Sequence, residues 1–334
     1  MRYRRLGQSD IEISEVGFGV WTIATDWWGV VDDKAGLVNA ALDAGINFFD
    51  TAPAYGDDGF GERILAELLG RRDEVVITTK CGYDIKAPRM ANQSERPQDW
   101  SPAGVRRQVE DSLRRLQRDH IDLLQLHNVR IDAVRDEALW DELMKIRSEG
   151  KVRELGVALG PAIGWVEEGL ESLRTHDIVA LQTVFNLLEQ EPGLTFANEP
   201  AVKEGRVGVI ARVPHASDVL SGKITRDSVF AAGDHRGHRN PDNMLDNFEK
   251  AERLEYLWAP ETGRTIGQAA VAGILAFDGF TNVLPTCVTA HEVREYAAAS
   301  DLPLDADEKS ELDELWARNF DHTDRFVMPL KSSV

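Results

Sequence analysis

Cysteine is scarce in this 334-residue sequence: only Cys81 and Cys287 occur, far apart along the chain. Two distant cysteines do not form a disulfide framework, so we expect a reducing, cytoplasmic setting. A run of about 18 apolar residues is also missing, which argues against a membrane-spanning helix. The N-terminal residues lack the apolar core of a secretory signal peptide.

Positively charged residues are few, because the sequence has 38 Lys and Arg residues but 57 Asp and Glu residues. Its formal net charge is -19. Nucleic acids and anionic membranes would be repelled by such a surface, so we expect neither as a partner. For the same reason, an anionic cofactor would have to be held by local main-chain amides and a few cations.

Several motifs that would assign a function directly are absent. Gly17-Phe18-Gly19 has no third glycine at the Rossmann spacing, so a nucleotide would not bind in that way. The sequence has no His-x-His pair and no third ligand at a predicted strand end, so we expect no metal site. No linker or change of composition divides the chain, and we expect a single domain over residues 1–334.

Short apolar stretches alternate with helical patterns through most of the chain. The stretches expected as strands are residues 16–20, 47–50, 75–79, 121–126, 152–157, 178–182, 207–211 and 282–284. The helices expected between and after them are residues 62–69, 102–116, 136–148, 162–173, one within 196–204, 243–257, 266–277, 290–299 and 307–319. Eight strands separated by helices predict an α/β fold of the (β/α)8 TIM barrel type. Residues 1–14 read as a β-hairpin, and residues 286–334 as C-terminal helices and a tail.

Four polar residues lie at or just past the ends of three successive predicted strands. Asp50 and Tyr55 follow the second strand, Lys80 the third and His127 the fourth. The C-terminal strand ends of a (β/α)8 barrel carry its chemistry, so we expect these four residues to converge into one proton-transfer site.

The chemistry of this set centres on Tyr55, a poor acid with a pKa of about 10 when unperturbed. Lys80 would lower this pKa by stabilising the phenolate, and Asp50 would keep a buried Lys80 charged. His127 could donate to a substrate oxygen or relay protons. The set can give a proton to a carbonyl oxygen but contains no nucleophile, so a cofactor must supply the other half of the reaction.

Other interpretations exist for each residue taken alone. A tyrosine before a glycine is common in turns, Lys80 could be a solvated strand end, and His127 a buried core histidine. Asp50 and His127 could bind metal, but a third ligand is missing. Lys80 could form a Schiff base, but a charge partner such as Asp50 works against that role.

Together with further motifs, these residues resemble the aldo-keto reductase superfamily. The matching segments, in the family's order, are Val16–Gly19, Phe49–Ala52, Tyr55-Gly56, Gly61-Glu62, Leu69-Gly70, Thr79-Lys80, Asp122–His127, Gly150–Arg153, Gly156-Val157, Gln182, Phe185-Asn186 and Leu220–Lys223. The resemblance covers most of the chain and implies a barrel whose bottom is closed by the N-terminal hairpin. It also implies reduction of an aldehyde or ketone, with Tyr55 as general acid, Lys80 and Asp50 tuning it, and His127 orienting the carbonyl.

The resemblance implies NADPH as hydride donor, with NADH as the alternative. The residues it places at the cofactor are Gly19, Trp21, Gln182, Arg212, Pro214, Ser217, Val219, Lys223, Thr286, Thr289, Glu292 and Tyr296. Among them, Arg212 replaces a stacking aromatic residue, and its guanidinium plane could stack similarly. Elsewhere, Ala158-Leu159-Gly160 stands where relatives carry Ser-Asn, Asp218 replaces a glycine, and Val288 replaces the arginine that meets the 2′-phosphate.

The substrate side is less informative. Trp27 and Trp28 follow the first predicted strand and could wall a pocket for an apolar carbonyl compound, or simply pack the loop. Residues 234–239 suit a lid over the cofactor or a solvated loop. The main alternative function is a nucleotide-binding sensor or interaction protein on the same fold, and the oligomeric state is not predicted.

Overall fold

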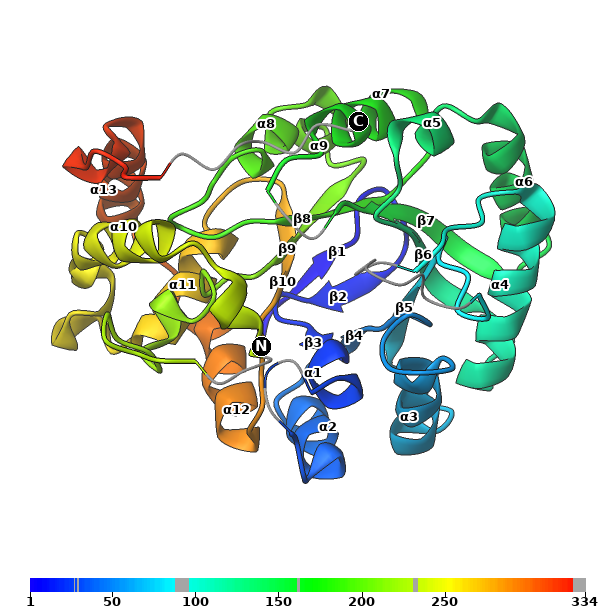
Figure 1. Ribbon diagram of the computed structural model, residues 1–334, viewed down its shortest axis with the longest axis horizontal. Coiled ribbons are helices and arrows are strands. Elements are labelled where there is room, and N and C mark those ends of the chain that lie inside the picture. Colours follow the sequence, from blue (N-terminus) through cyan, green and yellow to red (C-terminus); the bar gives the residue numbers. More distant parts are fainter. Residues whose placement is uncertain (27, 29, 88–95, 161–162, 231–233, 327–334) are drawn as a thin grey trace.

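The computed structural model describes residues 1–26, 28, 30–87, 96–160, 163–230 and 234–326. Eight parallel strands form its centre (Figure 1). They are β3 (Phe18–Gly19), β4 (Phe48–Asp50), β5 (Val76–Cys81), β6 (Ile121–His127), β7 (Val152–Ala158), β8 (Ala180–Val184), β9 (Gly208–Arg212) and β10 (Phe280–Leu284). Each strand pairs with the next, and a parallel bridge between Val16 and Val283 joins the two ends of the sheet. The predicted (β/α)8 barrel is confirmed.

The N-terminal hairpin consists of β1 (Tyr3–Arg5) and β2 (Glu12–Ser14), which pair antiparallel. Its apolar residues Leu6, Ile11 and Ile13 are buried in a cluster with residues at the start of the barrel strands, such as Phe48 and Val76. The hairpin therefore covers the N-terminal end of the barrel, as predicted, and leaves the opposite end for the site.

Helices alternate with the strands and surround them (Figure 1). They are α1 (Trp21–Ala24), α2 (Lys34–Asp43), α3 (Phe60–Leu69), α4 (Pro102–Leu116), α5 (Ile131–Val134), α6 (Glu137–Ser148), α7 (Val166–Thr175), α8 (Gly193–Ala197), α9 (Pro200–Lys203), α10 (Pro241–Glu252), α11 (Ile266–Leu275), α12 (Ala290–Ala298) and α13 (Ala306–Ala317). Within the described ranges, no helix is long and apolar enough to cross a membrane.

Three helix predictions were wrong at their boundaries. The helix expected from residue 162 begins at Val166, because Trp165 before it adopts a left-handed conformation with φ 62°. The helix expected within 196–204 is divided into α8 and α9, since Glu199 is extended before Pro200. The helix expected to reach residue 257 ends at Glu252, and a short 3-10 helix, η3 (Glu255–Trp258), follows it.

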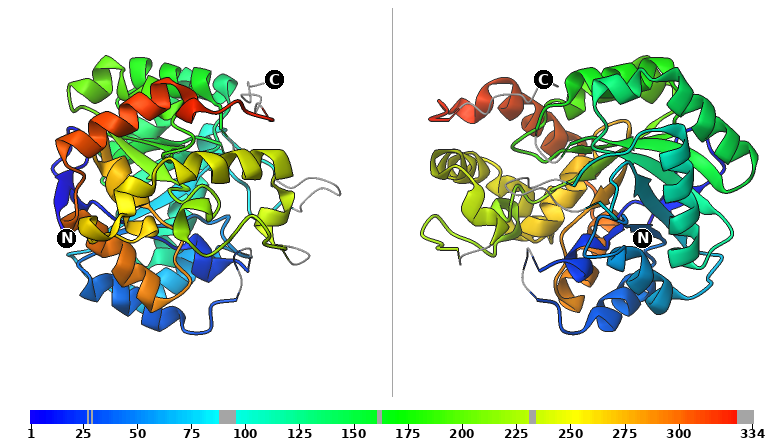
Figure 2. Two further views of the ribbon diagram at one scale, coloured as in Figure 1. Left: turned by 90° about the vertical axis from the view of Figure 1, so that its left-hand side faces the viewer. Right: turned by 45° about the vertical axis from the view of Figure 1, so that its right-hand side comes forward.

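The connection between β9 and α11 is the longest over the C-terminal end of the barrel. It contains the 3-10 helices η1 (Val219–Ser221) and η2 (His235–His238), and then α10. In Figures 1 and 2, α10 lies on the same side of the barrel as the C-terminal helix α13, and His322, which follows α13, contacts Asp246 of α10 at 3.0 Å. Two segments far apart in sequence thus meet at this side of the barrel.

Candidate active site

The ends of β4 and β5 bring Asp50 and Lys80 into direct contact. Lys80 Nζ lies 2.6 Å from Asp50 Oδ2 and 2.9 Å from the carbonyl oxygen of Thr51. The other carboxylate oxygen, Asp50 Oδ1, accepts hydrogen bonds from Gln182 at 3.0 Å and Gln125 at 3.2 Å. The side chain of Lys80 is only 1% exposed, so a fully partnered carboxylate holds its charge in place.

Tyr55 lies directly over this ion pair. Lys80 Nζ is 4.9 Å from the centre of the Tyr55 ring. The ring meets Trp21 edge-on at 4.9 Å between centroids and His127 edge-on at 5.8 Å. The structure therefore brings Asp50, Tyr55, Lys80 and His127 together, and adds Trp21 as a wall of the same site.

Burial dominates the ionisation of these groups. It raises the pKa of Tyr55 above its usual value, and the nearby Lys80 opposes that rise without overcoming it. Burial lowers the pKa of Lys80, but Asp50 and Tyr55 outweigh it, so the net shift is upward. Burial, Lys80 and Arg212 hold the pKa of His127 well below its usual value. At neutral pH the site thus offers a protonated phenol, an ammonium and a neutral imidazole.

Hydrogen bonds fix the loop around His127. Gln98 Nε2 donates to the carbonyl oxygens of His127 at 3.0 Å and Asn128 at 3.2 Å. Asn128 Nδ2 donates to the Tyr83 hydroxyl at 2.8 Å, and the Tyr83 ring meets the His127 ring edge-on at 5.0 Å. Tyr83 is a second aromatic wall of the site.

Arg212 ends β9 and points toward the end of β7. One of its terminal nitrogens donates to the carbonyl oxygen of Leu159 at 2.6 Å and also to that of Gly160. Its Nε is buried and has no hydrogen-bond partner among the described residues. Burial lowers the pKa of Arg212, while the nearby Tyr55 and Asp50 oppose that shift. The predicted stacking residue is thus anchored by main-chain carbonyls beside the catalytic candidates.

The loop after β9 has the features of an anion cradle. Ala216, Ser217 and Asp218 adopt left-handed conformations in succession, with φ of 47°, 57° and 74°. The amide of Ala216 donates to the carbonyl oxygen of Val213 at 3.2 Å, so the amides of this turn that suit phosphate oxygens are those of Ser217 and Asp218. Ser217 Oγ is buried without a partner in the described part of the chain, so it has a hydrogen bond left to make. These features fit the pyrophosphate of a dinucleotide.

The charge of Asp218, a position where the resemblance led us to expect glycine, is matched by an arginine from the predicted lid. Arg236 Nη1 lies 2.7 Å from Asp218 Oδ2, and the same guanidinium also contacts Asp234. Its central carbon lies 5.5 Å from the centre of the Trp28 ring. Segment 234–239 is therefore tied over the cradle by an ion pair that the sequence patterns did not suggest.

The start of α12 is occupied by a side chain. Thr289 and Glu292 form a capping box, in which Glu292 Oε2 accepts from the amides of Val288 at 2.7 Å and Thr289 at 3.3 Å. Glu292 Oε1 pairs with Lys223 at 2.8 Å. The amides of Val288 and Thr289 at this helix start are thus already bound by a carboxylate.

The other predicted cofactor residues differ in accessibility. Open space lies above Gly19, where an added Cβ would meet nothing within 4 Å, and Thr286 is partly exposed. Pro214 and Val219 are buried, as is Tyr296, whose ring packs on His215 at 4.3 Å and on Gly267. Tyr296 therefore packs under the loop after β9 through His215. Trp27, a predicted substrate contact, lies outside the described residues.

A family model of the Aldo/keto reductase family matches residues 15–317. The chain belongs to this family. It is 32% identical over 288 residues to aldo-keto reductase YhdN of Bacillus subtilis (strain 168), covering 82% of this chain and 81% of that one. It is 30% identical over 327 residues to the NADH-specific methylglyoxal reductase of Escherichia coli (strain K12), covering 90% and 94%. Among solved structures, the glycerol dehydrogenase of Gluconobacter oxydans matches with a TM-score of 0.80 at 28% identity, covering 98% and 99%. The protein is thus an oxidoreductase by family.

Two features of this aldo/keto reductase were not predicted as functional. Gln125 donates a hydrogen bond to Asp50. Its position as a polar residue inside the apolar strand β6 was the feature of the sequence that could have indicated this role. Arg236 neutralises Asp218, which lies 18 residues earlier in the sequence, and local sequence patterns do not predict such a pair.

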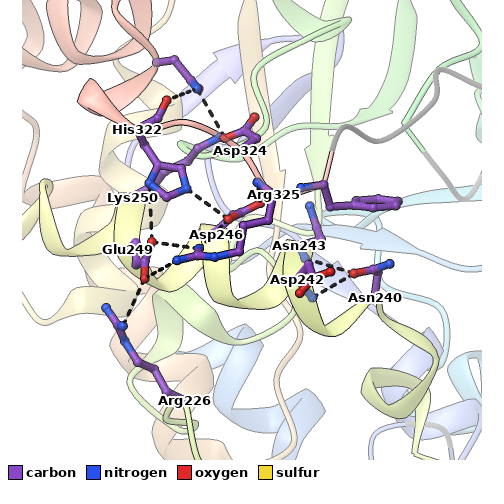
Figure 3. A network of polar contacts seen from close by, with 12 residues as sticks. Arg226, Asn240, Asp242, Asn243, Asp246, Glu249, Lys250, His322, Asp324 and Arg325 are labelled. Atoms are coloured by element: carbon purple, nitrogen blue, oxygen red, sulfur yellow. Dashed lines mark hydrogen bonds and ion pairs between the residues drawn. The ribbon is translucent and has the colours of Figure 1, made fainter.

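A polar cluster away from this site has the residue types of a metal centre. One ligand atom each of Asp246, His322 and Asp324 lies within 4.8 Å of the others. However, Arg325 contacts Asp246 at 2.7 Å and Lys250 contacts Asp324 at 2.7 Å (Figure 3). These cations already balance the carboxylates, so the cluster is an ion-pair network that joins the C-terminal segment to α10.

Proposed function

We propose that this aldo/keto reductase reduces an aldehyde or ketone to an alcohol with a nicotinamide cofactor. The observation that carries the proposal is the contact of Lys80 with Asp50 at 2.6 Å beneath the buried ring of Tyr55. A protonated phenol held next to an ammonium can give up its proton to a carbonyl oxygen and be stabilised as a phenolate.

In this proposal each of the four residues at the strand ends has its own role in the reduction. Tyr55 transfers its phenolic proton to the carbonyl oxygen, while Lys80 stabilises the charge that remains on the tyrosine. His127, kept neutral by burial, donates a hydrogen bond that orients the same oxygen. Asp50 holds Lys80 protonated. The bound nicotinamide supplies the hydride that the carbonyl carbon receives.

Residues in the loop after β9 suit the binding of the cofactor. The Ser217 hydroxyl and the left-handed run from Ala216 to Asp218 would hold the pyrophosphate, with Lys223 as the nearby cation. The nicotinamide would lie near Trp21 and Arg212.

Cofactor choice rests on the start of α12. The resemblance implied NADPH, but Val288 offers no cation, and Glu292 occupies the amides of Val288 and Thr289 at this helix start. A phosphate would also be repelled by that carboxylate. We therefore propose that NADH serves at least as well as NADPH, as the name of the NADH-specific relative also suggests.

The substrate we propose is a small carbonyl compound, and methylglyoxal is a natural first choice from the name of that relative. The Trp21 ring contacts the Tyr55 ring and the Tyr83 ring contacts the His127 ring, so the substrate would meet aromatic side chains beside both catalytic candidates. We also propose a cytoplasmic location, because Cys81 and Cys287 are both buried and unpaired.

The test replaces Tyr55 by phenylalanine and follows nicotinamide oxidation with methylglyoxal and a panel of other aldehydes. We expect kcat to fall roughly 100- to 10,000-fold while the dissociation constants of NADH and NADPH stay within about threefold. Tyr3→Phe is the matched control, since Tyr3 is 49% exposed on the hairpin. If the wild-type protein binds a nicotinamide cofactor but turns over no aldehyde, the sensor function replaces the reductase proposal.

A further inference from the structure

Arg212 forms no ion pair with a carboxylate in the part of the chain that the structure describes. Its hydrogen bonds go to two neutral carbonyl oxygens, those of Leu159 and Gly160, and its Nε has no partner among the residues described. Asp50 is near enough to influence the ionisation of Arg212, but its carboxylate is already in contact with Lys80 at 2.6 Å. With His127 neutral, the site carries two positive charges against one negative charge.

The position of the nicotinamide relative to Arg212 follows from the proposed reaction, on which this inference rests. Tyr55 protonates the carbonyl oxygen, and the hydride goes to the carbon bonded to that oxygen. The hydride-giving ring must therefore lie within a few ångströms of the Tyr55 hydroxyl. Arg212 ends β9 next to Val184 of β8, and Gln182 of the same strand β8 binds Asp50, so the guanidinium lies at the strand ends that carry the site and its charge reaches the ring.

We propose that Arg212 makes the site select the redox state of the cofactor, so that it holds the reduced form more tightly than the oxidised form. The reduced nicotinamide ring is neutral, whereas the oxidised ring carries a positive charge that the uncompensated guanidinium repels. Two unit charges about 6 Å apart at an effective dielectric constant of about 20 change a dissociation constant by roughly 100-fold, and water in the groove would reduce this toward tenfold.

The effect falls on binding more than on hydride transfer. During transfer, positive charge grows on the ring and negative charge grows on the carbonyl oxygen, and Arg212 opposes the first and favours the second. The two influences largely cancel at the transition state. Arg212 is therefore a specificity residue that loads the reduced cofactor, releases the oxidised one and limits product inhibition during carbonyl reduction.

The experiment measures dissociation constants of NADH, NAD⁺, NADPH and NADP⁺ by fluorescence titration. The proteins are the wild type, Arg212→Gln, Arg212→Met and Arg212→Lys, each checked for folding by circular dichroism. We expect the ratio of oxidised to reduced dissociation constants to fall roughly tenfold or more in the two neutral variants. It should stay within about threefold of wild type in Arg212→Lys, which keeps the charge.

Different outcomes separate this inference from the function it rests on. An unchanged ratio in a folded neutral variant, or a wild-type ratio near one, overturns the role of Arg212 and leaves the reductase intact. If the wild-type protein binds none of the four nucleotides, the proposed function itself fails. The wild-type ratio keeps the inference testable even if the neutral variants do not fold.

Discussion

Arg236 from the loop after β9 neutralises Asp218, their side chains meeting at 2.7 Å over the predicted pyrophosphate cradle. Asp218 is 5% exposed at its side chain, so without Arg236 its charge would be left largely buried beside the phosphates. We expect Arg236→Gln to weaken NADH and NADPH binding about tenfold, as measured by fluorescence titration.

The double variant Arg236→Gln with Asp218→Gly provides the control. It removes both charges and also relieves the left-handed conformation at position 218, where φ is 74°. Binding should return to within about threefold of wild type. If the double variant binds as weakly as Arg236→Gln, the arginine acts on the cofactor directly and not through Asp218.

A second prediction concerns the ion pair under Tyr55. Asp50→Asn should lower the free energy of unfolding by about 3 kcal/mol, because Lys80 would remain buried without its counter-charge. Lys80→Met should instead reduce kcat at least 100-fold, since the phenolate would lose its nearest cation. Urea unfolding and steady-state kinetics separate the two effects. Asp58→Asn, in an exposed pair with Arg63, should change neither quantity, and a similar loss there would point to a general effect of charge.

Sequence patterns predicted the barrel and the convergence of Asp50, Tyr55, Lys80 and His127, because strand ends of a parallel barrel must meet at one edge. What they did not predict depends on side-chain contacts between elements that are far apart in the sequence. Gln125 and Gln182 bind Asp50 from two further strands, and Arg236 reaches back to Asp218. Tyr296 matched an expected cofactor position by sequence, yet the absence of a side chain at Gly267 lets it pack inward. Such placements depend on tertiary packing, and the local periodicity of the sequence carries no information about it.

A third prediction tests cofactor choice at the start of α12. Glu292→Gln keeps the capping hydrogen bonds but removes the charge facing the cofactor groove, and Val288→Arg adds a cation there. Together they should raise the affinity for NADPH relative to NADH about tenfold or more. Glu295→Gln, one turn further along and bound to Thr265, is the matched control. If the ratio of the NADPH and NADH affinities does not change, the 2′-phosphate of bound NADPH does not lie near Val288 and Glu292.

A fourth prediction concerns acid stability. Burial lowers the pKa of His215 to about 4, and it also lowers those of His127 and His176. The unfolded chain takes up protons at these histidines near pH 6.5 while the folded chain does not, so the folded state loses stability as pH falls below that value. The loss from His215 should accumulate between about pH 6.5 and 4, at up to about 1.4 kcal/mol per pH unit. Urea unfolding at a series of pH values should show a shallower slope for His215→Asn, and an unchanged slope would contradict this account.

The last prediction concerns the attachment of the C-terminal segment to α10 through Asp246. This carboxylate is 2% exposed at its side chain and accepts hydrogen bonds from the amides of Arg325 at 2.8 Å and Phe326 at 3.0 Å (Figure 3). It also contacts the side chains of Arg325 at 2.7 Å and His322 at 3.0 Å. Asp246→Ala would leave two amides without their acceptor and Arg325 with Glu249 as its remaining carboxylate, at 2.9 Å, so we expect the free energy of unfolding to fall by about 3 kcal/mol.

The same change should expose the segment to protease before the barrel unfolds. Trypsin should cleave at Arg325 faster in Asp246→Ala than in the wild type, with the remaining chain intact at first. Asp242→Ala, on the exposed first turn of α10, should leave both the stability and the cleavage rate nearly unchanged. Since α10 packs against η1 beside the cradle, freeing the segment should also weaken NADH binding severalfold. Weaker binding without faster cleavage would mean that Asp246 acts on the cradle through α10 alone, and that the C-terminal segment has no part in holding it.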